Sequence, residues 1–571
     1  MDKQLAKTLT LSVSLLQGIT LWFLYYSFEQ QIFPATDPIW FNPLVAVSIV
    51  LPVLFLLSST PQNWQRLLSF LGIFAIILTA MASYTGIQQT PVEIIESGGI
   101  LFAFVVTTGI ASFKAIMYGQ LWSEHDSLNY QKLFQLSWRN FLIAAESTLF
   151  TLILFAILNL GAALFEVIGI DLFSNLLQQS WFNIPVICMA FGFAIITFRR
   201  ISKTVDIIAS ILQTLIKFLL PMLAFVGVAF LFTLPFTGLE KLWATGHGSA
   251  LLLALQAMTL FFVNAVYQNQ HQQLPYPMFW HRFIYLSIAI LPIYSVIIAY
   301  GLWLRIDQYG WSVSRCWGVM IWAILTCFCL GYLQGIVRQK DKWLNTLSRV
   351  NVRMGLVMLL LMIVVNTPLL NFQQISANSQ IQRLDDNVIE AEELDINYFR
   401  WNLGRSGYLA LQQLKKSLQV SHPALVTKID RIYAPKRDAD EEVSLAQFQQ
   451  FVDYWPDARQ FPDDLLNALY NQENNRWFRL GHQHYTLIAF DLNQDSTPEY
   501  LSVEQSSNFT NINIWRTNEA EAWHSQGLYY NGNDSDDLAD IRKLLDTGKI
   551  KTVDPMWQDI MIGEVRLRVP L

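Results

Sequence analysis

The chain has 571 residues, of which 53% are hydrophobic and only 14% are charged. A soluble globular protein carries about 25% charged residues, so this composition excludes an ordinary soluble protein. The formal net charge of −6 is modest, and it predicts no nucleic-acid partner, because binding to a phosphate backbone depends on clustered positive charge.

Hydrophobic stretches fill the first 370 residues, and each is close to the roughly 20 residues that cross a bilayer as a helix. The first stretch follows basic residues as a signal peptide would, but its apolar run is too long and no small-residue cleavage pattern follows. We therefore predict about eleven spans, the first one retained. They cover 8–28, 43–59, 67–87, 98–118, 140–161, 182–198, 218–236, 249–267, 283–304, 316–336 and 354–370.

Lysine and arginine occur almost entirely in alternate gaps between these stretches. Translocation of these residues is disfavoured, so the basic gaps predict cytoplasmic loops. The gap 337–353 is the most basic, whereas the gap 29–42 has no basic residue. Eleven spans that start from a cytoplasmic N-terminus place residues 371–571 outside the cytoplasm. We expect a multi-pass protein of the bacterial inner membrane with a periplasmic C-terminal domain.

Residues 371–571 contain no run of spanning length and hold most of the acidic residues. Residues 379–418 predict two helices broken near 403–407, and 444–470 predicts a further helical region. Strand patterns at 484–490 and 499–503 flank the turn sequence DLNQDSTP, which indicates a hairpin, and 512–515 and 565–569 are further strand candidates. The expected fold is therefore a polytopic α-helical membrane domain over 1–370, followed by a soluble α+β domain over 371–571.

Several stretches resemble the bacterial inner-membrane family known as domain of unknown function 4153. They are WLRIDQYGWSVSR (303–315), SQIQRL (379–384), YFRWNLGRSGYLALQQL (398–414) and DLNQDSTPEYL (491–501). The resemblance covers about half of the chain, and its pieces occur in the expected order. It implies a multi-span membrane protein with no assigned activity, and it carries over no catalytic residue.

The gap after the ninth span contains Arg305, Asp307, Tyr309 and Arg315, and it is the external gap with two arginines. Two guanidinium groups at a membrane edge suit a lipid phosphate or another anion, because arginine binds phosphate oxygens bidentately. The alternative is that these arginines pair with Asp307 and with acidic groups of the following domain, and so dock that domain on the membrane face.

The predicted hairpin turn has the spacing of a short calcium loop, with candidate ligands at Asp491, Asn493, Asp495 and Glu499. Ser496 replaces the glycine that such loops use for their tight turn, so an ordinary polar turn is the alternative. His482 and His484 form a His-x-His pair on a predicted strand. Zinc would need a further ligand, so a structural role is the alternative there. We predict no cofactor other than this possible calcium ion.

Two polar residues inside predicted spans are further candidates. Glu146 lies in the fifth stretch, where a carboxylate suits a proton or cation site, although it can also reach the interface or pair with Arg139. Asn264 lies in the eighth stretch, and interhelical hydrogen bonding accounts for it equally well.

These features predict an integral membrane protein with a non-catalytic role in sensing, scaffolding or an envelope process, exerted through its extracytoplasmic domain. The expected partners are the lipid bilayer and other membrane or envelope proteins. One alternative is a transporter or lipid-handling protein with Glu146, Asn264, Arg305 and Arg315 along its path. Another is a membrane enzyme acting on a lipid-linked substrate, although common nucleotide-binding and hydrolase motifs do not occur in the sequence.

Overall fold

The computed structural model divides into two compact units, Met1–Pro435 and Lys436–Leu571. It describes residues 7–92, 94–95, 98–239, 242–243, 246–267, 275–340, 343–418, 422–433, 445–456, 461–474, 484–491, 499–505, 510–517, 523–528, 560–562 and 565–567.

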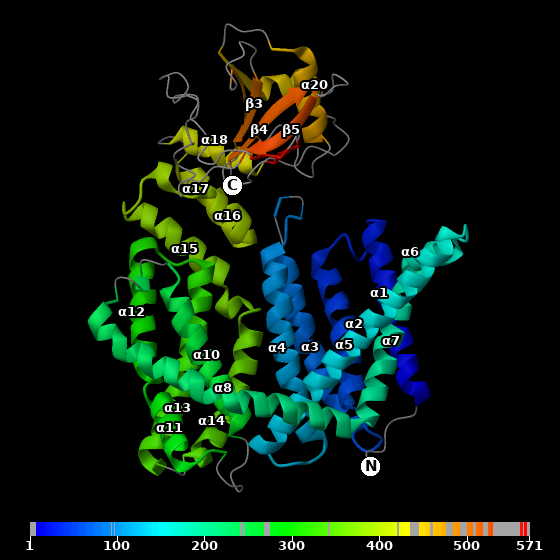
Figure 1. Ribbon diagram of the computed structural model, residues 1–571, viewed down its shortest axis with the longest axis vertical. Coiled ribbons are helices and arrows are strands. Elements are labelled where there is room, and N and C mark those ends of the chain that lie inside the picture. Colours follow the sequence, from blue (N-terminus) through cyan, green and yellow to red (C-terminus); the bar gives the residue numbers. More distant parts are fainter. Residues whose placement is uncertain are drawn as a thin grey trace. The chain divides into compact units, whose positions relative to one another are not determined.

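Long helices build the first unit (Figure 1). Among the described residues, eleven helical segments are long and apolar enough to cross a membrane. Each overlaps one predicted span, and α11 and α12 together form one segment. The helices are α1 (Lys7–Glu29), α2 (Pro38–Ser58), α3 (Trp64–Gln88), α4 (Gly98–Ser123), α5 (Tyr130–Val167), α6 (Leu172–Gln178), α7 (Ser180–Arg200), α8 (Ser202–Thr237), α10 (Gly248–Val266), α11 (Met278–Ala289), α12 (Leu291–Tyr309), α13 (Val313–Gln339) and α14 (Leu344–Val364).

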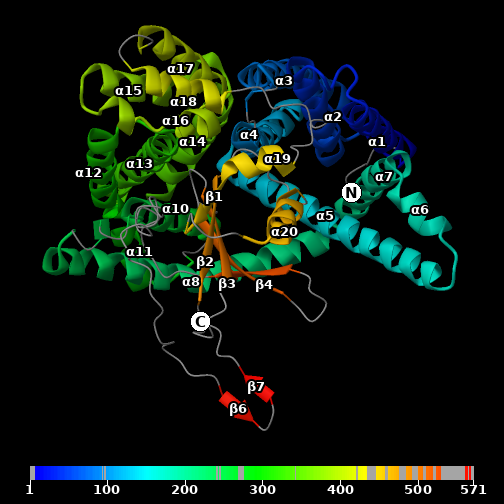
Figure 2. The same cartoon turned by 90° about the horizontal axis from the view of Figure 1, so that it is seen from above.

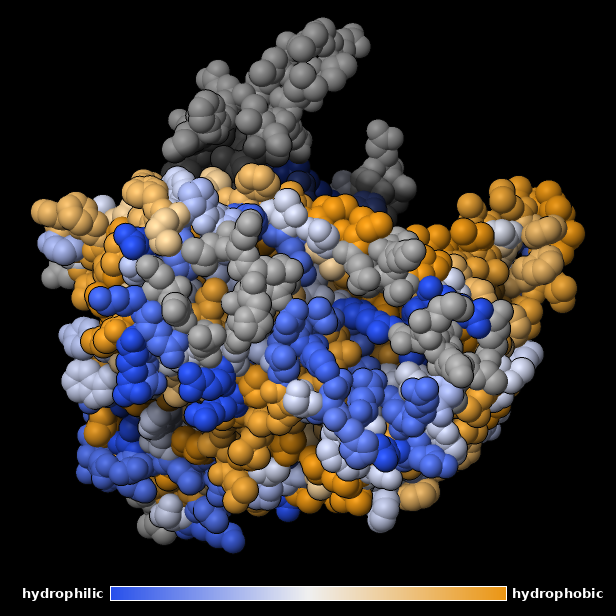
Figure 3. Space-filling model, turned by 90° about the horizontal axis from the view of Figure 1, so that it is seen from below, coloured by the Kyte–Doolittle hydropathy of each residue, from blue (hydrophilic) through white to orange (hydrophobic). Residues whose placement is uncertain are grey.

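Large apolar side chains cover the outside of these helices. On α8 alone, Phe218, Phe232 and Phe236 are 73%, 72% and 79% exposed. A continuous apolar surface of this kind is not stable against water and is suited to lipid. Figure 3 views the molecule from below and shows hydrophilic residues interspersed with hydrophobic ones across the middle and left of that face, and a mainly hydrophobic margin at the upper right. The first unit is therefore typical of a multi-pass membrane protein.

The spanning helices form two groups that meet along one seam (Figures 1 and 2). In the first group, α1 and α5 pack on α7, and α2 and α4 pack on α3. In the second group, α8 packs on α10 and α11, while α12 and α14 pack on α13. The most extensive contact between the groups is the packing of α4 on α14, so these two helices define the seam.

A set of shorter helices follows α14 and also belongs to the first unit. They are η2 (Pro368–Leu370), α15 (Phe372–Asp385), η3 (Ala391–Glu393), α16 (Ile396–Asn402), α17 (Gly404–Leu418) and α18 (Pro423–Ile432). The predicted break near 403–407 is found at Leu403. We call α15–α17 the bracket, because α15 packs on α13 of the second group, while α16 and α17 pack on α4 and α3 of the first.

The position of the bracket differs from the expected division of the chain at residue 370. Phe372 is 5% exposed and shares an apolar cluster with Cys316 and Met362 of the spanning helices. The following helices bury Phe399 and Leu403 in a cluster that also contacts Val313. These shared cores join residues 371–435 to the helical unit, so the compact units divide after Pro435.

The second unit is built on a five-stranded sheet of order β1-β2-β3-β4-β5. β1 is parallel to β2, and the other neighbours are antiparallel. Its elements are α19 (Leu445–Phe448), η4 (Gln449–Phe451), β1 (Val452–Trp455), α20 (Asp463–Asn474), β2 (His484–Phe490), β3 (Glu499–Gln505), β4 (Thr510–Thr517) and β5 (Trp523–Leu528), with a separate pair β6 (Ile560–Ile562) and β7 (Val565–Leu567).

The predicted hairpin is present as β2 and β3, and the strand predictions at 512–515 and 565–569 correspond to β4 and β7. The expectation of a continuous helical region over 444–470 is wrong, because β1 interrupts it. Val452 is buried with Tyr485 of β2 in the core of this unit, and these two residues are partners in the parallel ladder. Pairing with the edge of β2 therefore overrides the local helical pattern.

Candidate functional site

A cavity of about 310 Å³ lies on the seam between the two helix groups. We call it the Lys114 cavity. Residues of α4, α5, α10, α13 and α14 line it, so every wall is helical and the two groups face each other across it. The lining includes Lys114, Tyr118, Tyr130, Trp138, Phe261, Asn264, Ala265, Phe328, Asn351, Gly355 and Met358.

Lys114 is the charged residue of this cavity. It lies within the otherwise apolar α4, and its side chain is half-buried. Among the described residues, its ammonium group makes no hydrogen bond and no ion pair. A charged side chain inside a membrane helix is costly and normally faces a partner or a functional cavity. The cavity is therefore the place where this charge can meet an anion.

A hydrogen-bond network fixes the opposite wall. The Asn264 Oδ1 atom accepts hydrogen bonds from Tyr332 OH at 2.9 Å, from Asn351 Nδ2 at 2.6 Å and from Tyr130 OH at 3.3 Å. The single Tyr332 OH proton is shared between Asn264 Oδ1 and Asn351 Oδ1. These four residues come from α10, α13, α14 and α5, so the network ties both helix groups together beside the cavity. A satisfied buried network of this kind holds its members rigidly.

Aromatic and other apolar side chains supply the rest of the lining, with Trp138, Phe261 and Phe328 prominent among them. Such a surface favours an apolar group, because transfer of that group from water gains about 25 cal/mol per Å². A lysine at one point of an otherwise aromatic cavity suits a ligand with one anionic end and an apolar body. Pockets of this composition, apolar with a few placed polar groups, are typical of small-molecule sites.

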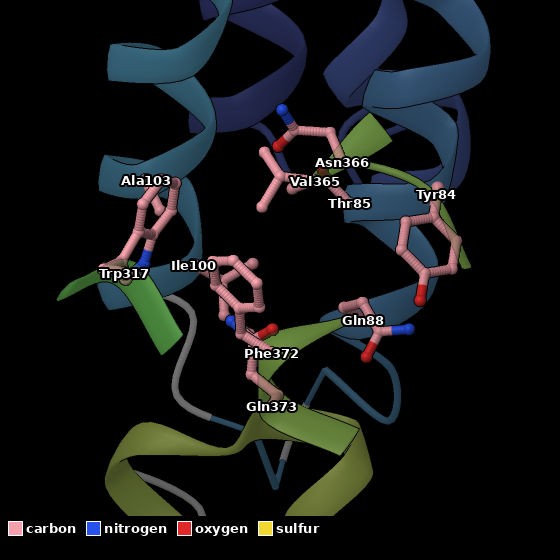
Figure 4. A pocket seen from close by; sticks show the side chains of 10 residues that line it. All are labelled: Tyr84, Thr85, Gln88, Ile100, Ala103, Trp317, Val365, Asn366, Phe372 and Gln373. Atoms are coloured by element: carbon pink, nitrogen blue, oxygen red, sulfur yellow. The ribbon is translucent and has the colours of Figure 1, made fainter. Parts of the chain in front are cut away.

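A second, much smaller pocket lies farther along the same seam (Figure 4). We call it the Tyr84 pocket, and its volume of about 30 Å³ is roughly a tenth of that of the Lys114 cavity. Figure 4 shows Tyr84 and Gln88 of α3 on one side and Trp317 of α13 on the other, with Phe372 of the bracket between them. The bracket therefore contributes to closing this end of the seam.

Two polar side chains of the Tyr84 pocket, Tyr84 and Asn366, are hydrogen-bonded to other parts of the protein. Tyr84 OH accepts a bond from Asn371 Nδ2 at 2.7 Å. Asn366 Nδ2 donates to Thr107 Oγ1 at 2.8 Å and also to the Met362 carbonyl. These bonds join α3 and α4 to the segment that follows α14, so they hold the two helix groups together at this end.

The predicted arginine loop has a structural arrangement. Arg315 donates to the Gly310 carbonyl at 2.8 Å, and its guanidinium lies 5.4 Å from the centre of the Tyr309 ring, which Arg305 also approaches at 5.8 Å. No ion pair joins Asp307 to either arginine among the residues that the structure describes. The Arg315 guanidinium thus neutralises carbonyls at the C-terminus of α12, where a cation is favourable.

Arg383 completes this arrangement, and the sequence analysis did not identify it as a site residue. It donates to the Gln308 carbonyl at 2.9 Å, beside the carbonyl that Arg315 binds. Arg383 lies in the SQIQRL stretch. Its partner is a backbone carbonyl, and because every residue has one, the sequence does not show which carbonyl an arginine binds.

The stretches that resemble the family are hydrogen-bonded to one another. The Trp311 amide donates to Ser379 Oγ at 2.9 Å, and the Val313 amide donates to Tyr398 OH at 2.9 Å. Gly404 has φ of +50° and lies where a Cβ would meet Ile100 at 2.5 Å, so glycine is required for this approach. The residues at 303–315, 379–384 and 398–414 therefore form one assembly that anchors the bracket.

The structure brings Asn264 to the cavity but does not bring Glu146 there. Glu146 lies on α5, half-buried, and its Oε1 atom has no hydrogen-bond partner among the described residues. Lys114 takes the place that the sequence analysis gave to Glu146. Its signal was a lone lysine within the predicted stretch 98–118.

The candidate metal ligands are described only in part. Asp491 follows β2 and Glu499 begins β3, and the pairing of Phe490 with Glu499 brings the two ends of the turn together. Asn493 and Asp495 lie outside the described residues, as does His482. His484 begins β2. The calcium and zinc sites therefore stay predictions.

A comparison with protein families gives one match: the family described as a domain of unknown function (DUF4153) matches residues 45–414. The match spans ten of the predicted spans and the bracket, including the stretches at 303–315, 379–384 and 398–414. It ends before the hairpin at 491–501. No curated protein and no solved structure matches the chain.

Proposed function

Since the chain belongs to the DUF4153 family, we propose that it is a non-catalytic integral membrane protein that binds a small organic anion in the Lys114 cavity. The observation that carries the proposal is the Lys114 ammonium group, which lies without a polar partner among the described residues in a cavity of about 310 Å³. The aromatic lining selects an anion with an apolar body, such as an arylalkyl carboxylate or sulfonate.

The same proposal assigns an orientation in the bacterial inner membrane. The basic gaps support a cytoplasmic N-terminus, an odd number of spans and a C-terminal unit in the periplasm. On this assignment Tyr130 and Asn351 lie near cytoplasmic helix ends, so the Lys114 cavity belongs to the cytoplasmic half of the membrane. The C-terminal unit then acts as the sensing or scaffolding part, toward other membrane or envelope proteins.

Thermal unfolding of the purified full-length protein in detergent tests the cavity. The probe is phenylmethanesulfonate, and its neutral partner is phenylmethanesulfonamide, which has nearly the same shape. We expect the sulfonate to raise the Tm and the sulfonamide to have a much smaller effect, because only the sulfonate can pair with Lys114. Saturation at about 100 times the Kd corresponds to roughly 2.7 kcal/mol of stabilisation.

The matched variants are Lys114→Met, which keeps an unbranched apolar side chain but lacks the ammonium group, and Lys114→Arg, which keeps the charge. Lys114→Met should abolish the difference between the two compounds, whereas Lys114→Arg should retain it. Equal effects of sulfonate and sulfonamide on the unaltered protein would contradict the proposal, as would an unchanged response of the Lys114→Met protein.

A further inference from the structure

The Lys114 cavity and the Tyr84 pocket are lined in part by the same helices. Along α4, Ile100 and Ala103 line the pocket, and Lys114 and Tyr118 line the cavity. Residues three or four positions apart lie on one face of a helix. The positions 100, 103, 107, 111, 114 and 118 therefore form a single face that leads from the pocket to the cavity.

Two other helices repeat this order. Val365, directly after the end of α14, lines the pocket, and Met358 of α14 lines the cavity. On α13, Trp317 lines the pocket and Phe328 lines the cavity. Three helices thus contribute to both spaces, each with one continuous face, and no other spanning helix among the described residues lines both.

A cluster of buried apolar residues includes Ala111, Met320, Ile324 and Met362, which lie between pocket-lining and cavity-lining positions in the sequences of their helices, and we call this cluster the plug. It contains no charged residue, so an anion cannot cross it in this conformation without losing its hydration, which is costly. The plug consists of Ala111 of α4, Cys316, Met320 and Ile324 of α13, Met362 of α14 and Phe372 of the bracket.

We infer that the pocket and the cavity are the two ends of one translocation path for the organic anion, and that the plug is its closed gate. This inference rests on the proposed function. In this structure the path is then wide at the Lys114 cavity and closed at the Tyr84 pocket. Passage requires the two helix groups to separate at the plug, as when one bundle rocks against another around a central site.

Native cysteines report on this opening. Cys316 lies in the plug and is 4% exposed, whereas Cys329 lies on the same helix in the core of the second group and is 0% exposed. Two proteins are compared, one that retains only Cys316 and one that retains only Cys329. The other cysteines are replaced by serine or alanine, and Tm values confirm that both proteins fold.

Each protein is treated with a negatively charged methanethiosulfonate in the presence of phenylmethanesulfonate. We expect Cys316 to react at least about tenfold faster than Cys329, because a state with an open plug only needs to be populated at the per cent level to dominate the rate. Local unfolding would expose both thiols, so Cys329 corrects for it.

Equal rates at Cys316 and Cys329 would overturn the path. If the sulfonate still raises the Tm in that case, the cavity proposal stands and only the path falls. If the sulfonate has no greater effect on Tm than the sulfonamide, both proposals fall together.

Discussion

The two spaces on the seam differ in volume by about an order of magnitude, 310 Å³ against 30 Å³, and they differ in their polar groups. At the Tyr84 pocket, asparagine and tyrosine side chains bond across the seam and hold it shut. At the Lys114 cavity, an asparagine network forms one wall, while a cation faces the space without a protein partner among the described residues. At the Tyr84 pocket the polar side chains therefore serve to hold the helices together. At the Lys114 cavity the ammonium group of Lys114 remains available to a ligand.

The bracket accounts for much of this difference. Arg405 of α17 bonds to Thr90 beyond the end of α3, while Asn371 bonds to Tyr84. Ser379 and Arg383 of α15 hold the loop between α12 and α13. The bracket therefore ties both helix groups together at the Tyr84 end, while away from the bracket α8 packs on α5 and α7 of the first group as well as on α10 and α11 of the second (Figure 1).

The largest expected effect concerns the polar wall of the cavity. Asn264→Ala removes the acceptor that three donors share, and an unsatisfied buried group costs about 1–3 kcal/mol. We expect the free energy of unfolding in mixed micelles to fall by about 3 kcal/mol. The control is Asn159→Ala, because among the described residues Asn159 bonds to the Phe155 carbonyl of its own exposed helix face alone. A similar loss of unfolding free energy in both variants would show that the Asn264 network contributes no more than a local hydrogen bond on an exposed helix face.

The same substitution of alanine by leucine should lower the stability at the Tyr84 pocket but leave it nearly unchanged at the Lys114 cavity. Ala103→Leu adds three carbon atoms in the Tyr84 pocket, where there is no room for them, and overpacking costs about 1–3 kcal/mol. Ala265→Leu adds the same atoms in the Lys114 cavity, so stability should change by less than about 0.5 kcal/mol, while the Tm response to phenylmethanesulfonate should shrink. Thermal unfolding of both variants measures this, and a stability loss at Ala265 as large as at Ala103 would contradict the difference in volume.

The smallest effects are expected at the arginine loop. Arg383→Ala removes a cation from the C-terminal carbonyls of α12 and should lower the free energy of unfolding by about 1 kcal/mol. Arg305→Ala should change it by less than about 0.5 kcal/mol, since its only described contact is with the Tyr309 ring. The measurement is denaturant unfolding of each variant. A larger effect at Arg305 than at Arg383 would favour the anion site over the structural arrangement.

The sequence was most informative where the signal is local. The spans follow from runs of apolar residues, and the β2–β3 hairpin follows from alternation on either side of a polar turn. The position of the bracket against the spanning helices could not be predicted. Phe372 and Leu403 show that its helices have apolar faces, but not which surface those faces cover. The grouping of Asn264, Asn351 and Tyr332 depends on contacts between distant helices, so only its members' polarity was visible. Lys114 was visible as a lone charge in a span.

The most direct test of the account is uptake of labelled phenylmethanesulfonate into proteoliposomes, because a sulfonate stays charged and crosses lipid slowly. The account predicts uptake above that of empty liposomes for the unaltered protein and for Lys114→Arg. For Lys114→Met, uptake should fall to the level of empty liposomes. Uptake by Lys114→Met that equals that of the unaltered protein would contradict the account, and so would an unaltered protein that takes up no more than empty liposomes.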